Sequence, residues 1–250
     1  MAPPPDNSTC SLGIVIPTFN EAENVGRLAR EILSFVPAAR IVVVDDSPAL
    51  ATTQAVEALG LPQVTVTHRS AKGGRGSAVI EGIRQLLDLG CSPILEMDAD
   101  FSHPPSQIPA LLREAEDRKL DLLVASRYLP GSEIRDWPVS RRWFSKSSNT
   151  LARAVLAVPI ADYTNGFRLY SLAAARVIRE TCGKEGKGFI ALSEILVNLH
   201  YRGLSIGETP TIFVNRARGE SSVNSQEIKN AVTGLVKIWL LKRKLVSEKG

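Results

Sequence analysis

The sequence predicts an α/β fold in which a mostly parallel sheet is covered by helices on both faces. Over the first 130 residues, short apolar runs alternate with segments whose apolar residues recur at helical spacing. This alternation is typical of parallel sheets. Polar residues directly follow several of the apolar runs, where such sheets bind ligands. With 250 residues, 44% of them hydrophobic, the chain can bury a substantial core.

The predicted elements follow one another in regular order. Strands are expected at the apolar runs 12–16, 41–44, 64–67, 93–97 and 120–125. The segment 164–170 is expected to form a turn and then a strand, and the segment 206–214 is expected to be extended. Helices are expected at the amphipathic segments 21–36, 77–89, 137–158, 191–201 and 227–246. The chain therefore divides into a disordered tail (1–10), one folded domain (11–223) and a C-terminal amphipathic helix (224–250). That helix either packs on the core or binds a membrane or a partner.

Charge and composition narrow the partners and the compartment. The net charge of +4 and the pI near 9.0 suit anionic phosphates or an anionic membrane leaflet. Aromatic residues make up only 6%, and basic runs interleaved with aromatics are absent, so a nucleic-acid partner is not expected. The three cysteines are odd in number and far apart, which supports neither a disulfide framework nor a zinc site and predicts a reducing, cytoplasmic setting. No apolar run reaches the length of a membrane span, so a soluble or peripheral protein is expected.

Asp98-Ala99-Asp100 places two carboxylates at the end of a predicted strand. Alternate residues of an extended segment share a face, so both carboxylates point to the same side. Oxygen ligands at this spacing, with the hydroxyl of Ser102, suit Mg²⁺ or Mn²⁺ bridging a diphosphate. A solvated acidic turn is the commoner explanation of a lone Asp-x-Asp. The buried strand before it and the stiff His-Pro-Pro after it favour a metal site here.

Two further segments carry weaker signals for a nucleotide. Asp45 and Asp46 end the second strand, where one carboxylate could bind a ribose or base and either could instead cap the next helix. The segment 72–77, Lys-Gly-Gly-Arg-Gly-Ser, is similar to a phosphate-binding loop at a helix N-terminus. Taken alone, however, that segment is better explained as a plain flexible loop.

Arg141 and Ser145 lie four residues apart on a predicted helix and therefore share a face. Together they could bind a phosphate monoester, although a basic solvent-exposed face is the ordinary explanation. Trp143 and Phe144 lie between them, and aromatic residues beside basic ones favour the headgroup zone of a membrane. This helix is therefore a candidate for a membrane-facing phosphate site.

Six short motifs follow one another along the chain, at 17–21, 45–48, 72–77, 97–105, 126–128 and 162–168. As an ordered series, they resemble the dolichol-phosphate (polyprenyl-phosphate) mannosyltransferase group of the family 2, inverting GT-A glycosyltransferases. The resemblance extends from about residue 12 to 223, so it implies that the predicted domain is a Rossmann-like GT-A glycosyltransferase domain.

The resemblance implies roles for individual residues. The nucleotide-sugar donor would be held by Pro17, Phe19, Glu21, Asp46, Lys72, Asp98, Ala99 and Asp100. The metal would be held by Asp98, Asp100 and Ser102, and the acceptor phosphate by Arg141 and Ser145. The catalytic residues would be Asp100, Arg127 and Arg216.

The chain departs from the family pattern at four places. Ser222 stands where a lysine is usual, which puts a cation at the diphosphate in doubt unless Arg218 substitutes. The Asp45-Asp46 segment is about one residue short, Phe19 stands for a frequent tyrosine, and Arg75 replaces a leucine between the loop glycines. These departures leave the donor open.

The implied function is transfer of mannose from GDP-mannose to a polyprenyl (dolichyl) phosphate, as in protein glycosylation, with inversion in a single displacement. The implied partners are a nucleotide sugar, a polyprenyl phosphate lipid and the cytosolic face of a membrane, where the protein would be peripheral. A small membrane subunit is a further partner left open. One alternative is a GT-A enzyme that uses UDP-glucose, another donor or a soluble acceptor. The other is a non-catalytic nucleotide-sugar-binding subunit, which Ser222 motivates.

Overall fold

A seven-stranded sheet forms the centre of the molecule, here a computed structural model that describes residues 10–70, 73–184, 190–215 and 225–248. The strands lie in the order β3-β2-β1-β4-β7-β5-β8, and every adjacent pair is parallel except the two pairs that β7 makes. Their bounds are β1 Gly13–Thr18, β2 Arg40–Asp45, β3 Val64–His68, β4 Ile94–Glu96, β5 Leu122–Ser126, β7 Arg168–Tyr170 and β8 Ile206–Pro210. The predicted mostly parallel sheet is confirmed.

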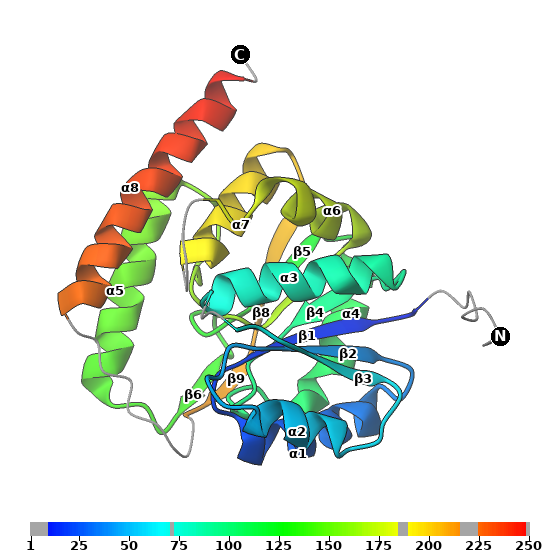
Figure 1. Cartoon of the computed structure of the whole chain (residues 1–250). Helices are drawn as coiled ribbons and strands as arrows, with labels where there is room; N and C mark the ends of the chain where they lie inside the picture. Colours follow the sequence, from blue (N-terminus) through cyan, green and yellow to red (C-terminus); the bar gives the residue numbers. More distant parts are fainter. Residues whose placement is uncertain (1–9, 71–72, 185–189, 216–224, 249–250) are drawn as a thin grey trace.

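Helices cover both faces of this sheet (Figure 1). On one face lie α3 (Arg75–Asp88), α6 (Leu172–Thr181) and α7 (Ile190–Tyr201), and on the other lie α1 (Ala22–Phe35), α2 (Ala51–Glu57) and α4 (Ile108–Asp117), which follows the short 3₁₀ helix η1 (Pro105–Gln107). Successive strand residues point to opposite faces. In β1, Val15 therefore packs under α3, whereas Ile14 and Ile16 pack against α1.

Two long helices form an outer layer beside the sheet. α5 (Val139–Leu156) and α8 (Ser225–Ser247) lie side by side in Figure 1, and α8 also contacts α7. Ile238 and Leu245 of α8 are buried in the core cluster beneath α3 and α7, while Val236 and Leu240 are about half exposed. The last helix therefore packs on the core and still presents apolar residues outward. Within the described residues, no helix is long and apolar enough to span a bilayer.

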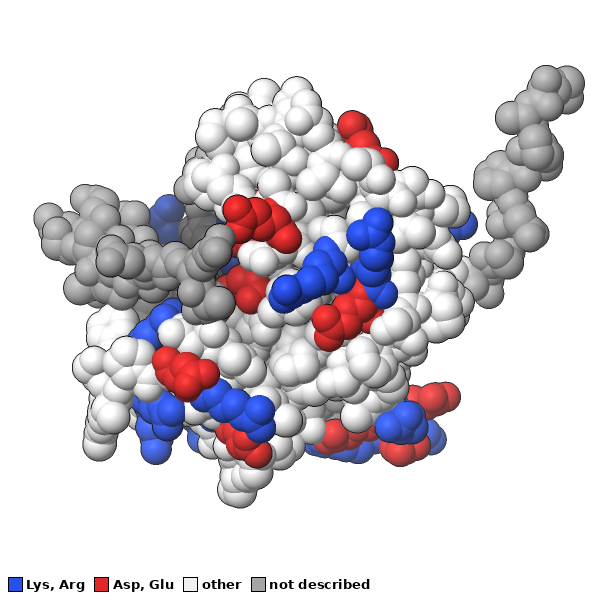
Figure 2. Space-filling model, turned by 90° about the horizontal axis from the view of Figure 1, so that it is seen from below, with Lys and Arg blue, Asp and Glu red and all other residues white. Residues whose placement is uncertain are grey.

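A small parallel ribbon joins two distant segments near the start of α5. It pairs β6 (Glu133–Arg135) with β9 (Ile212–Val214). The expected extended segment 206–214 is thus divided between the main sheet and this ribbon. On the face seen in Figure 2, Lys and Arg side chains lie beside Asp and Glu side chains, so charges of opposite sign are interspersed there.

The expected helices and strands are observed with small shifts at their ends, and among the described residues the sequence prediction missed five elements: α2, η1, α4, α6 and β6. For α6 a signal was present, because Ser171 caps the helix by accepting a hydrogen bond from the Ala174 amide at 3.1 Å. The predicted tail falls almost wholly on residues 1–9, and the predicted boundary at 223/224 falls within 216–224; both lie outside the described residues.

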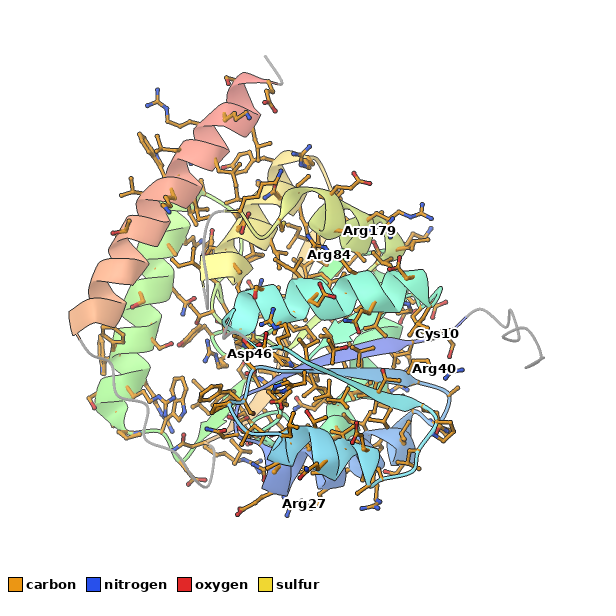
Figure 3. All side chains as sticks on the ribbon, viewed as in Figure 1. Cys10, Arg27, Arg40, Asp46, Arg84 and Arg179 are labelled. Atoms are coloured by element: carbon orange, nitrogen blue, oxygen red, sulfur yellow. A yellow bond between two sulfur atoms is a disulfide. The ribbon has the colours of Figure 1, made fainter. Side chains whose placement is uncertain are left out.

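The expectation that the cysteines support no disulfide was wrong, because Cys10 and Cys91 are joined. β1 and β4 are adjacent parallel strands, with Gly13 opposite Ile94, so the segments that precede them meet. Figure 3 shows Cys10 at the end of β1 that lies away from Asp46. Sequence spacing could not reveal this pair, because the two cysteines are 81 residues apart.

Candidate functional site

The carboxyl ends of β1, β2, β4 and β5 lie along the same edge of the sheet. The chain order reverses between β1 and β4, and open α/β sheets bind ligands at such a switch point. The segments that follow these four strands carry Asn20, Asp46, Asp98 and Arg127. The prediction that polar residues follow several strand ends on one edge of the sheet is therefore confirmed at the level of topology.

The two carboxylates after β2 have different surroundings. Asp45 is fully buried and accepts hydrogen bonds from the hydroxyls of Thr18 at 3.0 Å and Ser47 at 2.5 Å. Asp46 accepts two hydrogen bonds from Arg69, at 2.5 and 2.6 Å, and two from the amides of Gly73 and Gly74. Figure 3 shows Asp46 beneath the N-terminal end of α3.

Neither of these carboxylates caps the next helix, because α2 begins after Leu50, which makes no side-chain cap. Asp46 instead holds the glycine loop in place, together with Arg69. The sequence did not indicate Arg69. This residue directly follows β3, and its backbone amide donates to the backbone carbonyl of Asp45 at 2.9 Å. Lys72, expected to bind the donor from this loop, lies outside the described residues.

The end of β1 and the loop after it carry three of the expected donor-binding residues. Pro17 belongs to β1, Phe19 is 41% exposed, and Glu21 accepts a hydrogen bond from the Asn24 side chain at 2.8 Å. Asn20 has a positive φ of 59°, and its amide donates to the Ser47 hydroxyl at 2.7 Å. The β1 and β2 loops are thereby joined, and an exposed aromatic ring stands beside them.

The segment after β4 carries the predicted metal ligands. Ala99 and Ser102 are buried, and the Ser102 amide donates to Oδ1 of Asp100 at 3.1 Å. Phe101 adopts a positive φ of 60°, a strained conformation for a non-glycine residue, and its ring lies 4.2 Å from the Arg27 guanidinium. The backbone is thus sharply turned between the two carboxylates and the helix that follows.

The chemistry of this donor set fits a hard divalent cation, because the carboxylates of Asp98 and Asp100 are its first choice of ligand. Among the described residues, no group of three or more His, Cys, Asp or Glu side chains gathers at one point. The protein would therefore supply part of a coordination shell, and the rest would come from a bound diphosphate or from water.

Arg75, at the first turn of α3, contacts this segment directly. Its Nε and Nη2 both lie 2.8 Å from Oδ1 of Asp98, and its Nη1 lies 2.5 Å from Oε1 of Glu96. The Tyr170 hydroxyl donates to the other oxygen of Glu96 at 2.6 Å. Burial lowers the pKa of Arg75, but the carboxylates of Asp98 and Glu96 outweigh burial and hold that pKa above its ordinary value.

The sequence prediction missed Glu96 and Tyr170. A signal for Glu96 existed, because alternation along an extended segment puts positions 96, 98 and 100 on the same side. An acidic residue inside an otherwise apolar strand needs a partner. Tyr170 carried no such signal, since it lies on β7, 74 residues further along the chain.

Arg127 is buried at the end of β5 and paired with Asp162. Its Nε and Nη2 each donate to that carboxylate at 2.8 Å, and Nη2 also donates to the Thr164 hydroxyl at 2.7 Å. Burial raises the pKa of Asp162, but the Arg127 guanidinium outweighs burial and lowers it. The observed contacts of Arg127 therefore fix the loop at 162–165. Its expected role in catalysis stays a prediction.

His103 packs inside the site rather than facing a ligand. Burial lowers its pKa to about 4, so the imidazole is neutral at pH 7. The ring stacks on Phe167 at 4.6 Å, and Nε2 lies 2.8 Å from the Asn165 side-chain oxygen.

The predicted acceptor residues lie on the first turns of α5, next to the end of β5. The Tyr128 hydroxyl donates to Oγ of Ser145 at 2.6 Å. The guanidinium of Arg141 lies 4.4 Å from the centre of the Trp137 ring, which is also 5.3 Å from the guanidinium of Arg127. Trp137 therefore connects the expected acceptor site to the strand ends. Arg216, Arg218 and Ser222 lie outside the described residues.

Comparison with known proteins gives three concordant results. Residues 13–179 match the family described as Glycosyl transferase family 2. The chain is 33% identical to the polyprenol monophosphomannose synthase of Mycolicibacterium smegmatis over 240 residues, 95% of this chain and 89% of that protein. It is 34% identical to the undecaprenyl-phosphate mannosyltransferase of Micrococcus luteus over 234 residues, 92% of this chain and 94% of that protein.

A solved structure has the same fold. It is glucosyl-3-phosphoglycerate synthase from Mycobacterium tuberculosis in complex with Mn²⁺, uridine diphosphate and phosphoglyceric acid, with a TM-score of 0.66 and 17% identity. The match covers 92% of this chain and 78% of that one. The GT-A-like arrangement expected from the sequence is confirmed.

Proposed function

Because this chain belongs to glycosyl transferase family 2, we propose that it transfers mannose from GDP-mannose to a polyprenyl phosphate. The observation that carries this proposal is the pair of mannosyltransferase relatives. Each matches more than nine-tenths of this chain. By their names, one makes polyprenol monophosphomannose and the other transfers mannose to undecaprenyl phosphate. The strand-end crevice, with carboxylates after β4 and an arginine on α5 beside β5, supports it.

The donor would occupy the side of the crevice at β1, β2 and β4. Phe19 is exposed enough to stack on the base, next to Pro17 and Glu21, while Asp46 would act by holding the glycine loop through the amides of Gly73 and Gly74. Lys72 of the same loop, outside the described residues, would bind the donor. Asp98, Ala99 and Asp100 would face the diphosphate. A divalent cation, Mg²⁺ or Mn²⁺, held by Asp98, Asp100 and Ser102 would neutralise charge on the departing diphosphate.

The acceptor phosphate would lie against α5. Arg141 would pair with the phosphate, and Ser145, whose hydroxyl already accepts from Tyr128, would donate its own hydrogen to a phosphate oxygen. A phosphate ester is anionic at neutral pH, so its oxygen attacks without a strong general base. This agrees with the neutral, buried His103.

The reaction would be a single displacement. A phosphate oxygen of the acceptor forms the bond to the anomeric carbon as the bond to the diphosphate oxygen breaks, which inverts the configuration. Arg216 would stabilise the departing diphosphate, and Arg127 would contribute by fixing the loop that connects the donor and acceptor sides. Much of the rate gain would come from positioning the two reactants.

A lipid acceptor would bring the protein to a membrane surface. Trp143 and Phe144 are 68% and 51% exposed on α5, next to Arg142 and Lys146, which suits the headgroup zone. The protein would be peripheral on the cytosolic face, with or without a small membrane subunit.

A donor screen tests the proposal. The protein would be incubated with polyprenyl phosphate and with radiolabelled GDP-mannose, UDP-glucose or another nucleotide sugar, each with Mg²⁺, Mn²⁺ or a chelator. Label should enter the lipid extract from GDP-mannose only when a divalent cation is present. Label from UDP-glucose alone would reassign the donor, and tight nucleotide binding without turnover from any donor would indicate a non-catalytic subunit.

A further inference from the structure

A chain of paired polar groups leads from the interior of the sheet to the predicted metal ligands. Tyr170 on β7 donates to Glu96 on β4 at 2.6 Å, Glu96 accepts from Arg75 on α3 at 2.5 Å, and Arg75 reaches Oδ1 of Asp98 at 2.8 Å. Glu96 is fully buried, and the Arg75 side chain is 15% exposed. The positively charged guanidinium of Arg75 is thus paired with the carboxylates of Glu96 and Asp98 before any ligand binds.

The backbone leaves room for this cation at one specific place. A Cβ atom added to Gly166 would lie 1.8 Å from Nη2 of Arg75, and the Gly166 carbonyl accepts from that nitrogen at 3.4 Å. No positive φ accompanies this glycine. Glycine is therefore required here because it has no side chain, and the guanidinium of Arg75 fills the space that a side chain would occupy.

The position of Arg75 has an electrostatic consequence for ligands. Arg75 pairs with two neighbouring carboxylates, those of Glu96 and Asp98. Its positive charge next to Asp98 repels a divalent cation at that carboxylate and attracts a diphosphate. Both arginine nitrogens converge on the same oxygen of Asp98, which also restrains the orientation of that carboxylate.

We propose that Arg75 is a positioning residue that couples the divalent cation to the nucleotide diphosphate, so that the two bind this site together rather than separately. The inference rests on the proposed function, because it presupposes a metal-dependent donor site. With Arg75 in place, the cation alone meets partly neutralised carboxylates and binds weakly. The diphosphate supplies the missing negative charge and raises the affinity for the cation, and by linkage the cation raises the affinity for the diphosphate equally.

The test is a binding cycle that needs no turnover. Mn²⁺ affinity is measured by electron paramagnetic resonance with and without saturating GDP, and GDP affinity is measured by calorimetry with and without Mn²⁺. In Arg75→Met, we expect Mn²⁺ alone to bind more tightly and GDP alone more weakly, so that the coupling factor falls by about tenfold or more. Arg75→Lys keeps the charge and should keep most of the coupling.

Two further variants distinguish the guanidinium in its place from a general loss of charge. Gly166→Ala displaces the guanidinium without removing it. The coupling factor of this variant should therefore fall to a value between those of Arg75→Lys and Arg75→Met. Arg179→Met removes an exposed arginine of α6, labelled in Figure 3, and should leave the coupling unchanged. If Arg75→Met does not fold, judged by circular dichroism, Arg75→Lys and Gly166→Ala still decide the question.

The outcomes also separate this inference from the proposed function. Strong coupling in the native protein that persists in Arg75→Met and Gly166→Ala would overturn the role of Arg75 and leave the proposed function standing. Failure of the native protein to bind both Mn²⁺ and GDP would overturn both.

Discussion

At the residue scale, the polar groups of the crevice are held by partners from other elements. Asp46 is held by Arg69 and two loop amides, Asp98 by Arg75, and Asp162 by Arg127. Buried charges are tolerated when they are paired and hydrogen-bonded. Each pair therefore fixes the place of one carboxylate before a ligand binds, and losing one partner should affect both stability and binding.

Asp46→Asn tests the role of the carboxylate that holds the glycine loop. The amide cannot replace both charge-assisted bonds from Arg69, so we expect the free energy of unfolding to fall by about 1–3 kcal/mol and GDP affinity to fall with it. Urea unfolding and calorimetry measure the two effects. Asp88→Asn, at an exposed pair with Arg179, is the control and should change stability by less than about 0.5 kcal/mol. Equal effects of the two variants would contradict the assigned role.

Asp100→Ala tests the predicted metal site. Removing one of the two carboxylate ligands should lower kcat by about a hundredfold or more, since charge on the departing diphosphate loses its stabilisation. Mn²⁺-dependent GDP binding should weaken in parallel, while the melting temperature should change little because Asp100 is only half-buried. Full turnover in the presence of a chelator, in the native protein or the variant, would refute a metal-dependent site.

At the element scale, α5 carries two different sets of side chains. Arg141 and Ser145 lie toward Trp137 and Tyr128, near the strand ends, whereas Trp143 is mostly exposed. Residues two apart on a helix lie on different faces. One helix can therefore contact the acceptor phosphate with one face and a lipid surface with another.

Arg141→Ala tests the phosphate contact. Loss of a charge-assisted contact to the acceptor should raise the KM for polyprenyl phosphate by about tenfold and leave GDP affinity unchanged. Ser145→Ala should have a smaller effect, because it removes a neutral hydroxyl. Steady-state kinetics with varied lipid phosphate at saturating donor measure both variants. A rise in the donor KM instead would assign Arg141 to the other side of the crevice.

Replacing Trp143 and Phe144 together by serine tests the lipid-facing surface. Binding to vesicles that contain anionic lipid should weaken severalfold because exposed aromatic area is lost, while turnover of a short-chain, water-soluble acceptor should persist. Co-sedimentation with vesicles measures the first effect. Leu50→Ser, at a half-exposed position before α2, serves as the control. Unchanged sedimentation of the double variant would place the membrane contact elsewhere.

At the scale of the whole molecule, two core clusters on opposite faces of one sheet hold the crevice in place. The cluster under α3, α6 and α7 also receives side chains from α8, so the last helix contributes to the same core as the donor loop's helix. The Cys10–Cys91 disulfide joins the segments before β1 and β4 at the opposite edge from the crevice. The site is thus built on two neighbouring strands that are tied at their far ends.

Counting reactive thiols tests the arrangement of the three cysteines. Cys182 is buried, and burial raises its pKa to about 12, so its thiol should react slowly in the native protein. Without reductant, a maleimide probe should label no cysteine quickly in the folded protein and one after unfolding. Reduction before unfolding should raise the count to three. Mass spectrometry reads the count, and three labelled cysteines in unreduced, unfolded protein would show that the pair is not joined.

The sequence by itself determined the class of fold and the main strands. It also determined that the Asp98-Ala99-Asp100 segment follows a strand and that polar residues gather at strand ends. These follow from local properties, because the period of apolar residues and the polarity just after an apolar run are visible within a few neighbouring positions. The ordered motifs added the family, which the comparisons confirmed over residues 13–179. Helix α6 was also visible in principle, through its serine cap.

Only the tertiary structure decided which charged groups meet. Arg75 with Glu96, Arg127 with Asp162 and Cys10 with Cys91 are separated by 21, 35 and 81 residues, and no local pattern encodes such a pairing. Arg75 stood out in the sequence merely as a basic residue in place of a leucine. Its partners became visible once the fold placed β4 beside β7 and brought Arg75, in the first turn of α3, to Glu96 and Asp98. The physical reason is that a buried charge takes its partner from whatever the packing brings near, and packing depends on the whole chain.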